Sequence, residues 1–136
     1  MSLPVVLSIA GSDNSCGAGA QAELKTISAL GGYGLTAITC VVAEVPGKVS
    51  AIEAMPPSLV AEQIRLSLEA FPVAAIKTGM LYSAEIMTAV LATLRTWAER
   101  TGPLPPLVVD PVMVATSGDP LLQPDAIALY REQLLP

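Results

Sequence analysis

Short apolar runs alternate along this chain with longer segments in which apolar residues recur at helical spacing. Val5–Ala10 consists of branched and small residues and ends at Gly11, which favours a strand buried on both faces. Similar runs at Leu35–Val42, Ala74–Lys77 and Leu107–Asp110 predict three further strands. Strands that alternate with helices form crossover units around a parallel sheet. We therefore predict an α/β fold in which these four strands are parallel neighbours and their carboxyl ends face one cleft.

Four segments of the chain predict helices. They are Ala20–Leu30, Pro57–Phe71, the segment from the N-cap candidate Ser83 to Glu99, and Asp125–Leu135. The first ends at a Gly-Gly pair, and the second has apolar residues at every fourth position after an initial proline. Glu44–Met55 contains a Pro-Gly pair and alternating residues, so it predicts a turn and one short exposed strand.

The composition indicates one packed domain, or part of one. Of the 136 residues, 52% are hydrophobic and 14% are charged, with a net charge of −5. An acidic chain with scattered basic residues lacks the cationic surface of a nucleic-acid-binding protein. Two cysteines and no histidine exclude a disulfide framework, His-ligated metals and Ser-His-Asp or Cys-His triads within this chain. The apolar run near the N-terminus is too short for a signal peptide, and no stretch matches a membrane span, so we expect a cytoplasmic protein.

The predicted strand ends carry most of the candidate chemistry. Gly11-Ser12-Asp13, Ala43-Glu44, Thr78-Gly79-Met80 and Asp110-Pro111-Val112 follow the four strands. In a sheet of this kind, ligands bind outside the carboxyl ends of the strands. Asp13 is therefore either a cap of its own loop or a ligand to a substrate hydroxyl. This convergence of four strand ends predicts a binding site at one edge of the sheet.

Three other features near these ends each have two interpretations. Residues 17–22 (GAGAQA) fit a dinucleotide fingerprint, but they begin too far beyond the first strand, and their glycines equally suit close packing of a helix on the sheet. Cys16 is either a reactive thiol near a helix N-terminus or a small packing residue. Lys77 is either part of the site or a strand residue with an exposed tip, and no Gly-Lys-Ser/Thr triplet indicates a Walker A loop.

Five motifs along the chain match one family in order and spacing. They are AGSD at residues 10–13, GAG at 17–19, QAELK at 21–25, KTGML at 77–81 and DPVMVATSGD at 110–119. On these motifs, residues 5–136 resemble the hydroxymethylpyrimidine/phosphomethylpyrimidine kinases of the ribokinase-like superfamily. The resemblance implies a three-layer α/β/α fold with a mostly parallel central sheet, and a homodimer.

The resemblance also implies an activity and a set of site residues. The family uses ATP with Mg²⁺ to phosphorylate 4-amino-5-hydroxymethyl-2-methylpyrimidine and then its monophosphate, in thiamine biosynthesis. By resemblance the pyrimidine pocket is lined by Ala10, Gly11, Ser12, Asp13, Glu23, Glu44, Met80 and Val112. Asp110 and Thr116 are the candidates for contacts with the nucleotide, and no direct metal ligand is expected.

The chain departs from the family pattern at four positions. The family usually has Gln at the position of Glu44, Asp at that of Glu23, Gly at that of Cys16 and Lys at that of Thr116. Gln can both donate to and accept from an aminopyrimidine, whereas an ionised Glu44 only accepts. Glu44 therefore matches the ring only if the acid or the ring nitrogen carries a proton. This departure leaves two alternatives open: a kinase for pyridoxal or another hydroxymethyl heterocycle, and an inactive ligand-binding remnant.

Family members are about twice as long as this chain. The resemblance implies that residues 1–136 are the substrate-binding part of one domain. The anion hole, the catalytic base and most of the nucleotide site would belong to a C-terminal part outside this sequence, so we expect no catalytic residue here and no activity of the isolated chain. Ile127 and Leu134 on the last helix, together with an unpaired strand edge, predict either that the isolated chain aggregates or that a second segment covers these surfaces.

Overall fold

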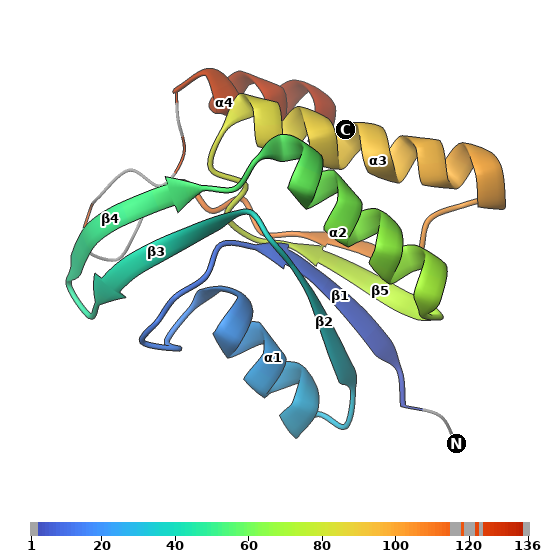
Figure 1. The fold of residues 1–136 in the computed structure, drawn as a ribbon, viewed down its shortest axis with the longest axis horizontal. Helices are drawn as coiled ribbons and strands as arrows, with labels where there is room; N and C mark the ends of the chain where they lie inside the picture. Colours follow the sequence, from blue (N-terminus) through green and yellow to red (C-terminus); the bar gives the residue numbers. More distant parts are fainter. Residues whose placement is uncertain (1–2, 115–117, 119–121, 123, 135–136) are drawn as a thin grey trace.

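A computed structural model describes residues 3–114, 118, 122 and 124–134 of the chain. Its main sheet contains β1 (Val5–Ala10), β2 (Tyr33–Ile38), β5 (Val73–Thr78) and β6 (Leu107–Val109) in the order β2-β1-β5-β6 (Figure 1). Each neighbouring pair is parallel. The prediction of four parallel neighbours is therefore confirmed, and β1 has the bounds that the sequence predicted.

Helices cover both faces of this sheet and give the expected three layers. They are α1 (Gly19–Ala29), α2 (Pro57–Ala70), α3 (Ala84–Thr101) and α4 (Pro124–Leu129), which continues as a π-helix over Tyr130–Leu134. In Figure 1, α1 lies on one side of the sheet, while α2, α3 and α4 lie on the other. None of the helices in the described part of the chain is long and apolar enough to cross a membrane.

The core lies between the sheet and the layer of α2 and α3. Leu7 and Ile9 of β1 and Ile76 of β5 are fully buried there against Ile64 of α2 and Val90 of α3. Because strand side chains alternate between faces, the intervening residues of β1 and β5 point toward α1 instead. This alternation leaves the α1 side of the sheet free for polar side chains.

The predicted strand Leu35–Val42 is wrong as a single element. β2 ends at Ile38, and β3 (Cys40–Val45) leaves the main sheet to pair antiparallel with β4 (Lys48–Ala54). The break is at Thr39, whose backbone N–H donates to the carbonyl of Ala10 and whose hydroxyl donates to that of Met80, at 3.0 and 2.6 Å. Hydrogen bonds to these distant residues end β2 and turn the chain out of the main sheet. No glycine or proline in the sequence marks this point.

The segment predicted as a turn and one short exposed strand is the second half of this hairpin. Its turn lies at Pro46-Gly47, as expected, and Gly47 has the positive φ of +82° that the turn requires. β4 is longer than predicted: it has seven residues and pairs with β3 over its whole length, with one register shift at Ser50. The hairpin extends beyond the carboxyl ends of the main sheet (Figure 1).

The helix boundaries follow the predicted signals at most ends. The Ser83 hydroxyl accepts a hydrogen bond from the backbone N–H of Ile86 at 3.3 Å, which confirms the predicted N-cap of α3.

Two surfaces were expected to lack a partner. On the last helix, Ile127 is 45% exposed, as expected, while the side chain of Leu134 lies outside the described residues. β6 is an edge of the sheet, and its Val108 is 60% exposed. Aggregation of the isolated chain stays a prediction.

Candidate functional site

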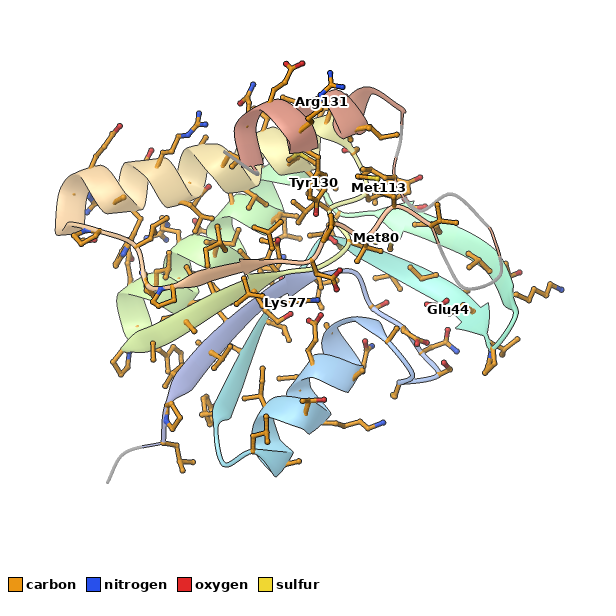
Figure 2. The ribbon with its side chains drawn as sticks, turned by 180° about the vertical axis from the view of Figure 1, so that it is seen from behind. Glu44, Lys77, Met80, Met113, Tyr130 and Arg131 are labelled. Carbon is orange, nitrogen blue, oxygen red and sulfur yellow. The ribbon has the colours of Figure 1, made fainter. Side chains whose placement is uncertain are left out.

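A cavity of about 750 Å³ opens at the carboxyl ends of the main sheet, between α1 and the β3–β4 hairpin. The sequence-predicted residues that line it are Ala10, Gly11, Ser12, Asp13, Glu23, Glu44, Met80, Asp110 and Val112. Figure 2 shows Glu44 on the hairpin and Lys77 and Met80 at the strand ends. Thr116 lies outside the described residues. The structure therefore brings together every predicted site residue that it describes.

Asp13 organises the loop that follows β1. Its buried carboxylate accepts hydrogen bonds from the backbone N–H groups of Ser15, Gly17 and Ala18, at 2.7, 3.0 and 2.8 Å. Burial acts to raise the pKa of Asp13, but the hydrogen bonds outweigh it and hold the pKa below its usual range. Of the two interpretations of Asp13, the structure favours the loop cap.

The start of α1 packs directly against the end of β1. A Cβ atom on Gly19 would lie 2.6 Å from the carbonyl oxygen of Gly11, and Gly19 has a φ of +59°. This glycine therefore serves close packing, as the second interpretation of the fingerprint residues proposed. Cys16 also has a positive φ, of 60°, which is unfavourable for a residue with a side chain.

Glu44 is the half-buried acid of the cavity. Its backbone N–H donates to the side-chain carbonyl of Asn14 at 2.7 Å, and no described group donates to its carboxylate. Burial, and next the negative charge of Asp13, raise the pKa of Glu44. The adjacent wall is apolar, because Met80 packs in a small cluster with Cys40, Val42 and Val112. A ligand here meets one available carboxyl group beside an apolar surface.

Lys77 is the centre of an ionic cluster at the other end of the cavity. Its ammonium group contacts the Glu23 carboxylate and lies 3.2 Å from the carboxylate of Asp110. The buried hydroxyl of Ser8 donates to the second oxygen of Glu23. The backbone of Gly79 lies so close that a Cβ there would be 3.1 Å from the lysine nitrogen. Lys77 is therefore part of the site rather than a strand residue with an exposed tip.

Sequence reasoning missed several residues that line the cavity. They are Ser8 beneath the ionic cluster and the hairpin residues Val45, Pro46, Gly47, Lys48 and Val49. The Pro-Gly signal identified the turn of the hairpin but not its position over the strand ends. Ser8 had one available signal, since it is the single polar residue within the apolar run of β1.

The lining residues define what the cavity can bind. Its described wall carries four carboxylates and two ammonium groups, and one of those carboxylates, Asp13, is occupied by its own loop. Among the described residues, no group of three or more Cys, Asp or Glu side chains is placed to hold a metal ion. Apolar walls with a few directed polar groups suit a small heterocycle that is neutral or cationic.

Comparison with known proteins finds similarity to phosphomethylpyrimidine kinases both in sequence and in structure. The family model described as phosphomethylpyrimidine kinase matches residues 13–136. A putative hydroxymethylpyrimidine/phosphomethylpyrimidine kinase 2 from Schizosaccharomyces pombe is 50% identical over 134 residues, which are 98% of this chain and 23% of that protein. The chain spans about half the length, or less, of the curated relatives it matches.

Solved structures show the same similarity in three dimensions. The crystal structure of phosphomethylpyrimidine kinase from Clostridium difficile 630 has a TM-score of 0.86 and 40% identity, covering 98% of this chain and 55% of that one. A pyridoxal kinase from Staphylococcus aureus in complex with pyridoxal has a TM-score of 0.80 and 34% identity, covering 100% of this chain and 48% of that one.

Proposed function

The chain belongs to the phosphomethylpyrimidine kinase family, and on that premise we propose that its strand-end cavity binds 4-amino-5-hydroxymethyl-2-methylpyrimidine. The observation that carries the proposal is the placement of the Glu44 carboxyl group beside the apolar wall of Met80 and Val112. An aminopyrimidine presents an apolar ring face and a polar edge with a donor and an acceptor. The ring would lie on the apolar wall, and the edge would pair with Glu44.

The remaining predicted residues complete this pocket. Ala10, Gly11 and Ser12 form its base at the end of β1, over the loop that Asp13 holds in place. Glu23 contributes through its contact with Lys77, which orients the ammonium group toward Asp110. The chain's contribution is thus to bind and orient the hydroxymethyl heterocycle.

We propose that the chain is the substrate-binding part of an ATP-dependent kinase that acts in thiamine biosynthesis. ATP would supply the transferred phosphoryl group, first to the hydroxymethyl group and then to the monophosphate. Asp110, half-exposed at the cavity rim, is the described residue best placed to face the nucleotide. Mg²⁺ would enter with the phosphates, since such ions take few direct protein ligands. The catalytic base and most of the nucleotide site would belong to the C-terminal part of a longer polypeptide, working in the cytoplasm as a homodimer.

A second candidate function is phosphorylation of pyridoxal or a related pyridine. Two observations favour it: the acid at position 44, and the 34% identity to a pyridoxal kinase whose structure contains pyridoxal. A carboxylate pairs well with a protonated pyridine nitrogen. The third alternative is an inactive ligand-binding remnant. For a remnant, the natural protein would have about the mass of this chain, whereas either kinase would be about twice as large.

Titration calorimetry of the full-length protein that contains this chain, with the hydroxymethyl pyrimidine and with pyridoxal, distinguishes these candidates. The proposal requires one site per chain and tighter binding of the pyrimidine; tighter binding of pyridoxal supports the second candidate. Met80→Ala should weaken binding, whereas Met113→Ala, an exposed methionine that does not line the cavity, should not. Binding of neither ligand refutes both proposals. Mass spectrometry of the natural protein, with a species near twice 14.0 kDa, would favour the kinase over the remnant.

A further inference from the structure

Tyr130 is a fully buried tyrosine on the π-helix that follows α4. Its hydroxyl lies 3.3 Å from the carbonyl oxygen of Gly79 and 3.3 Å from that of Asp110. A phenol has one proton to donate, so the two carbonyls share it in a bifurcated arrangement. In Figure 2 Met80 lies between Tyr130 and Glu44 in the view. One hydroxyl therefore joins the ends of β5 and β6.

The two carbonyls belong to the loops that form the apolar wall of the cavity. Gly79 immediately precedes Met80, and Asp110 lies two residues before Val112. The Asp110 carbonyl also accepts from the backbone N–H of Val112 at 2.8 Å, and the Asp110 N–H donates to Thr78 at 3.0 Å. β6 has only three residues, so few other backbone hydrogen bonds fix this loop relative to β5.

We propose that Tyr130 is a positioning residue whose hydroxyl holds the β5 and β6 end loops together, so that Met80 and Val112 form one ligand-binding wall. The inference rests on the proposed binding of a heterocycle in this cavity. It assigns a role to the last helical segment, none of whose described side chains lines the cavity. The segment would act on the ligand only through the two carbonyl groups.

The hydroxyl does not behave as a titrating group in this role. Burial raises the pKa of the Tyr130 phenol to about 12, so it remains protonated and able to donate at any physiological pH. Its effect on binding should therefore be independent of pH, unlike that of Glu44. The ring itself fills the core beside α3 and α4, so the substitution that isolates the hydroxyl is Tyr130→Phe.

Amide hydrogen exchange of the full-length protein that contains this chain, followed by NMR, tests the positioning role without a ligand. Tyr130→Phe should accelerate exchange of the Asp110 and Val112 amides by about 3- to 10-fold, the range expected for loss of one hydrogen bond. Amides in the centre of β1 report global unfolding, so Tyr130→Phe should accelerate their exchange less than that of Asp110 and Val112. The matched control is Ile64→Val, which removes a buried methylene from the same core, away from the cavity, and costs a similar amount of global stability.

Calorimetry with the hydroxymethyl pyrimidine supplies the second measurement. Tyr130→Phe should weaken binding by about 3- to 10-fold at every pH tested, while Ile64→Val should leave the affinity of the folded chain unchanged. Uniform acceleration of exchange in both variants overturns the positioning role, as does selective acceleration with unchanged affinity. If the parent binds no pyrimidine, the proposed function fails by itself, and the exchange comparison still decides whether the hydroxyl joins the two loops.

Discussion

Substitution of Glu44 by Gln and by Ala should separate the charge of this side chain from its hydrogen-bonding capacity. The proposed complex contains one pair between the Glu44 carboxyl group and the amino-and-nitrogen edge of the pyrimidine. No described group donates to this carboxylate in the free chain, so the ligand displaces only water from it. Glu44→Ala therefore removes the pair without leaving a second protein group unsatisfied.

The expected loss follows from the strength of such a pair. A hydrogen bond that involves a charged group contributes about 1.5–3 kcal/mol, which corresponds to about 10- to 150-fold in the dissociation constant. Glu44 is only half-buried, so the lower part of that range, about 10- to 30-fold, is the appropriate expectation for Glu44→Ala. Glu44→Gln restores a neutral donor and acceptor and should keep or improve the affinity.

The pH dependence has a definite sign. The pair with Glu44 needs one proton, held either by the acid or by the ring nitrogen. Burial and the charge of Asp13 raise the pKa of Glu44, so the acid keeps this proton to higher pH than an exposed glutamate, but it loses the proton as the pH rises further. Parent affinity should therefore fall as the pH rises through the raised pKa of Glu44, whereas Glu44→Gln needs no proton and should bind equally at each pH.

The same pKa shift affects the folding stability of the chain. Since the pKa of Glu44 is higher in the folded state than the value of about 4.3 in an unfolded chain, ionisation favours unfolding. The contribution of Glu44 is fully present below the unfolded pKa and is lost as the pH rises through the folded pKa. Urea denaturation should show that the free energy of unfolding of the parent falls relative to that of Glu44→Gln as the pH rises above the unfolded pKa of Glu44 and through its folded pKa.

Glu53→Gln is the control for these measurements. Glu53 is an exposed acid on β4 of the same hairpin and does not line the cavity, so its substitution removes the same charge without affecting the proposed pair. Calorimetry should show no change in affinity or pH dependence for this variant. Equal binding by the parent and Glu44→Ala would refute the pairing and place Glu44 on the rim as a bystander.

Three further substitutions test the structure by urea denaturation. Lys77→Met should lower the free energy of unfolding by about 1–3 kcal/mol because it leaves the largely buried Glu23 without its cation. Arg65→Met, which removes two exposed ion pairs, should change it much less. Cys16→Gly should raise the free energy of unfolding by about 1 kcal/mol because it relieves a positive φ, whereas Cys16→Ala should give no gain. Ser83→Ala should lower it by about 1 kcal/mol through loss of the α3 N-cap, and an unchanged value would contradict the cap.

Local sequence patterns predicted the main sheet because each strand is a short apolar run bounded by glycine or polar residues. The break at Thr39 was not predictable in this way. Its cause is hydrogen bonding to Ala10 and Met80, and no local signal marks such distant partners. The change from α4 to a π-helix at Tyr130 was missed as well, since both helix types bury apolar residues at similar spacing.

For the candidate site, the positions of the residues were predictable from the sequence, but the roles of their side chains were not. Parallel strands end at one edge, so the topology alone brought together the residues that follow β1, β5 and β6. What a side chain does within that edge depends on its partners in space. The sequence left Asp13 open between a loop cap and a ligand, and only the three backbone N–H groups around its carboxylate decided the matter. Lys77 was identified as a site residue only from its ion pairs with Glu23 and Asp110, which lie on other elements.

The inner position of β1 in the sheet has a consequence for synthesis of the protein on the ribosome. β1, α1 and β2 leave the ribosome before β5 and can form a parallel unit, but the other edge of β1 pairs with β5, which begins only at Val73. At about 5–20 residues per second, that edge stays open for on the order of a few seconds. During this interval an apolar strand edge is available to a nascent-chain chaperone or to a neighbouring polypeptide. The apolar wall of the cavity is complete only after Val112 has emerged, so a ligand can bind there only once most of this chain has been synthesised.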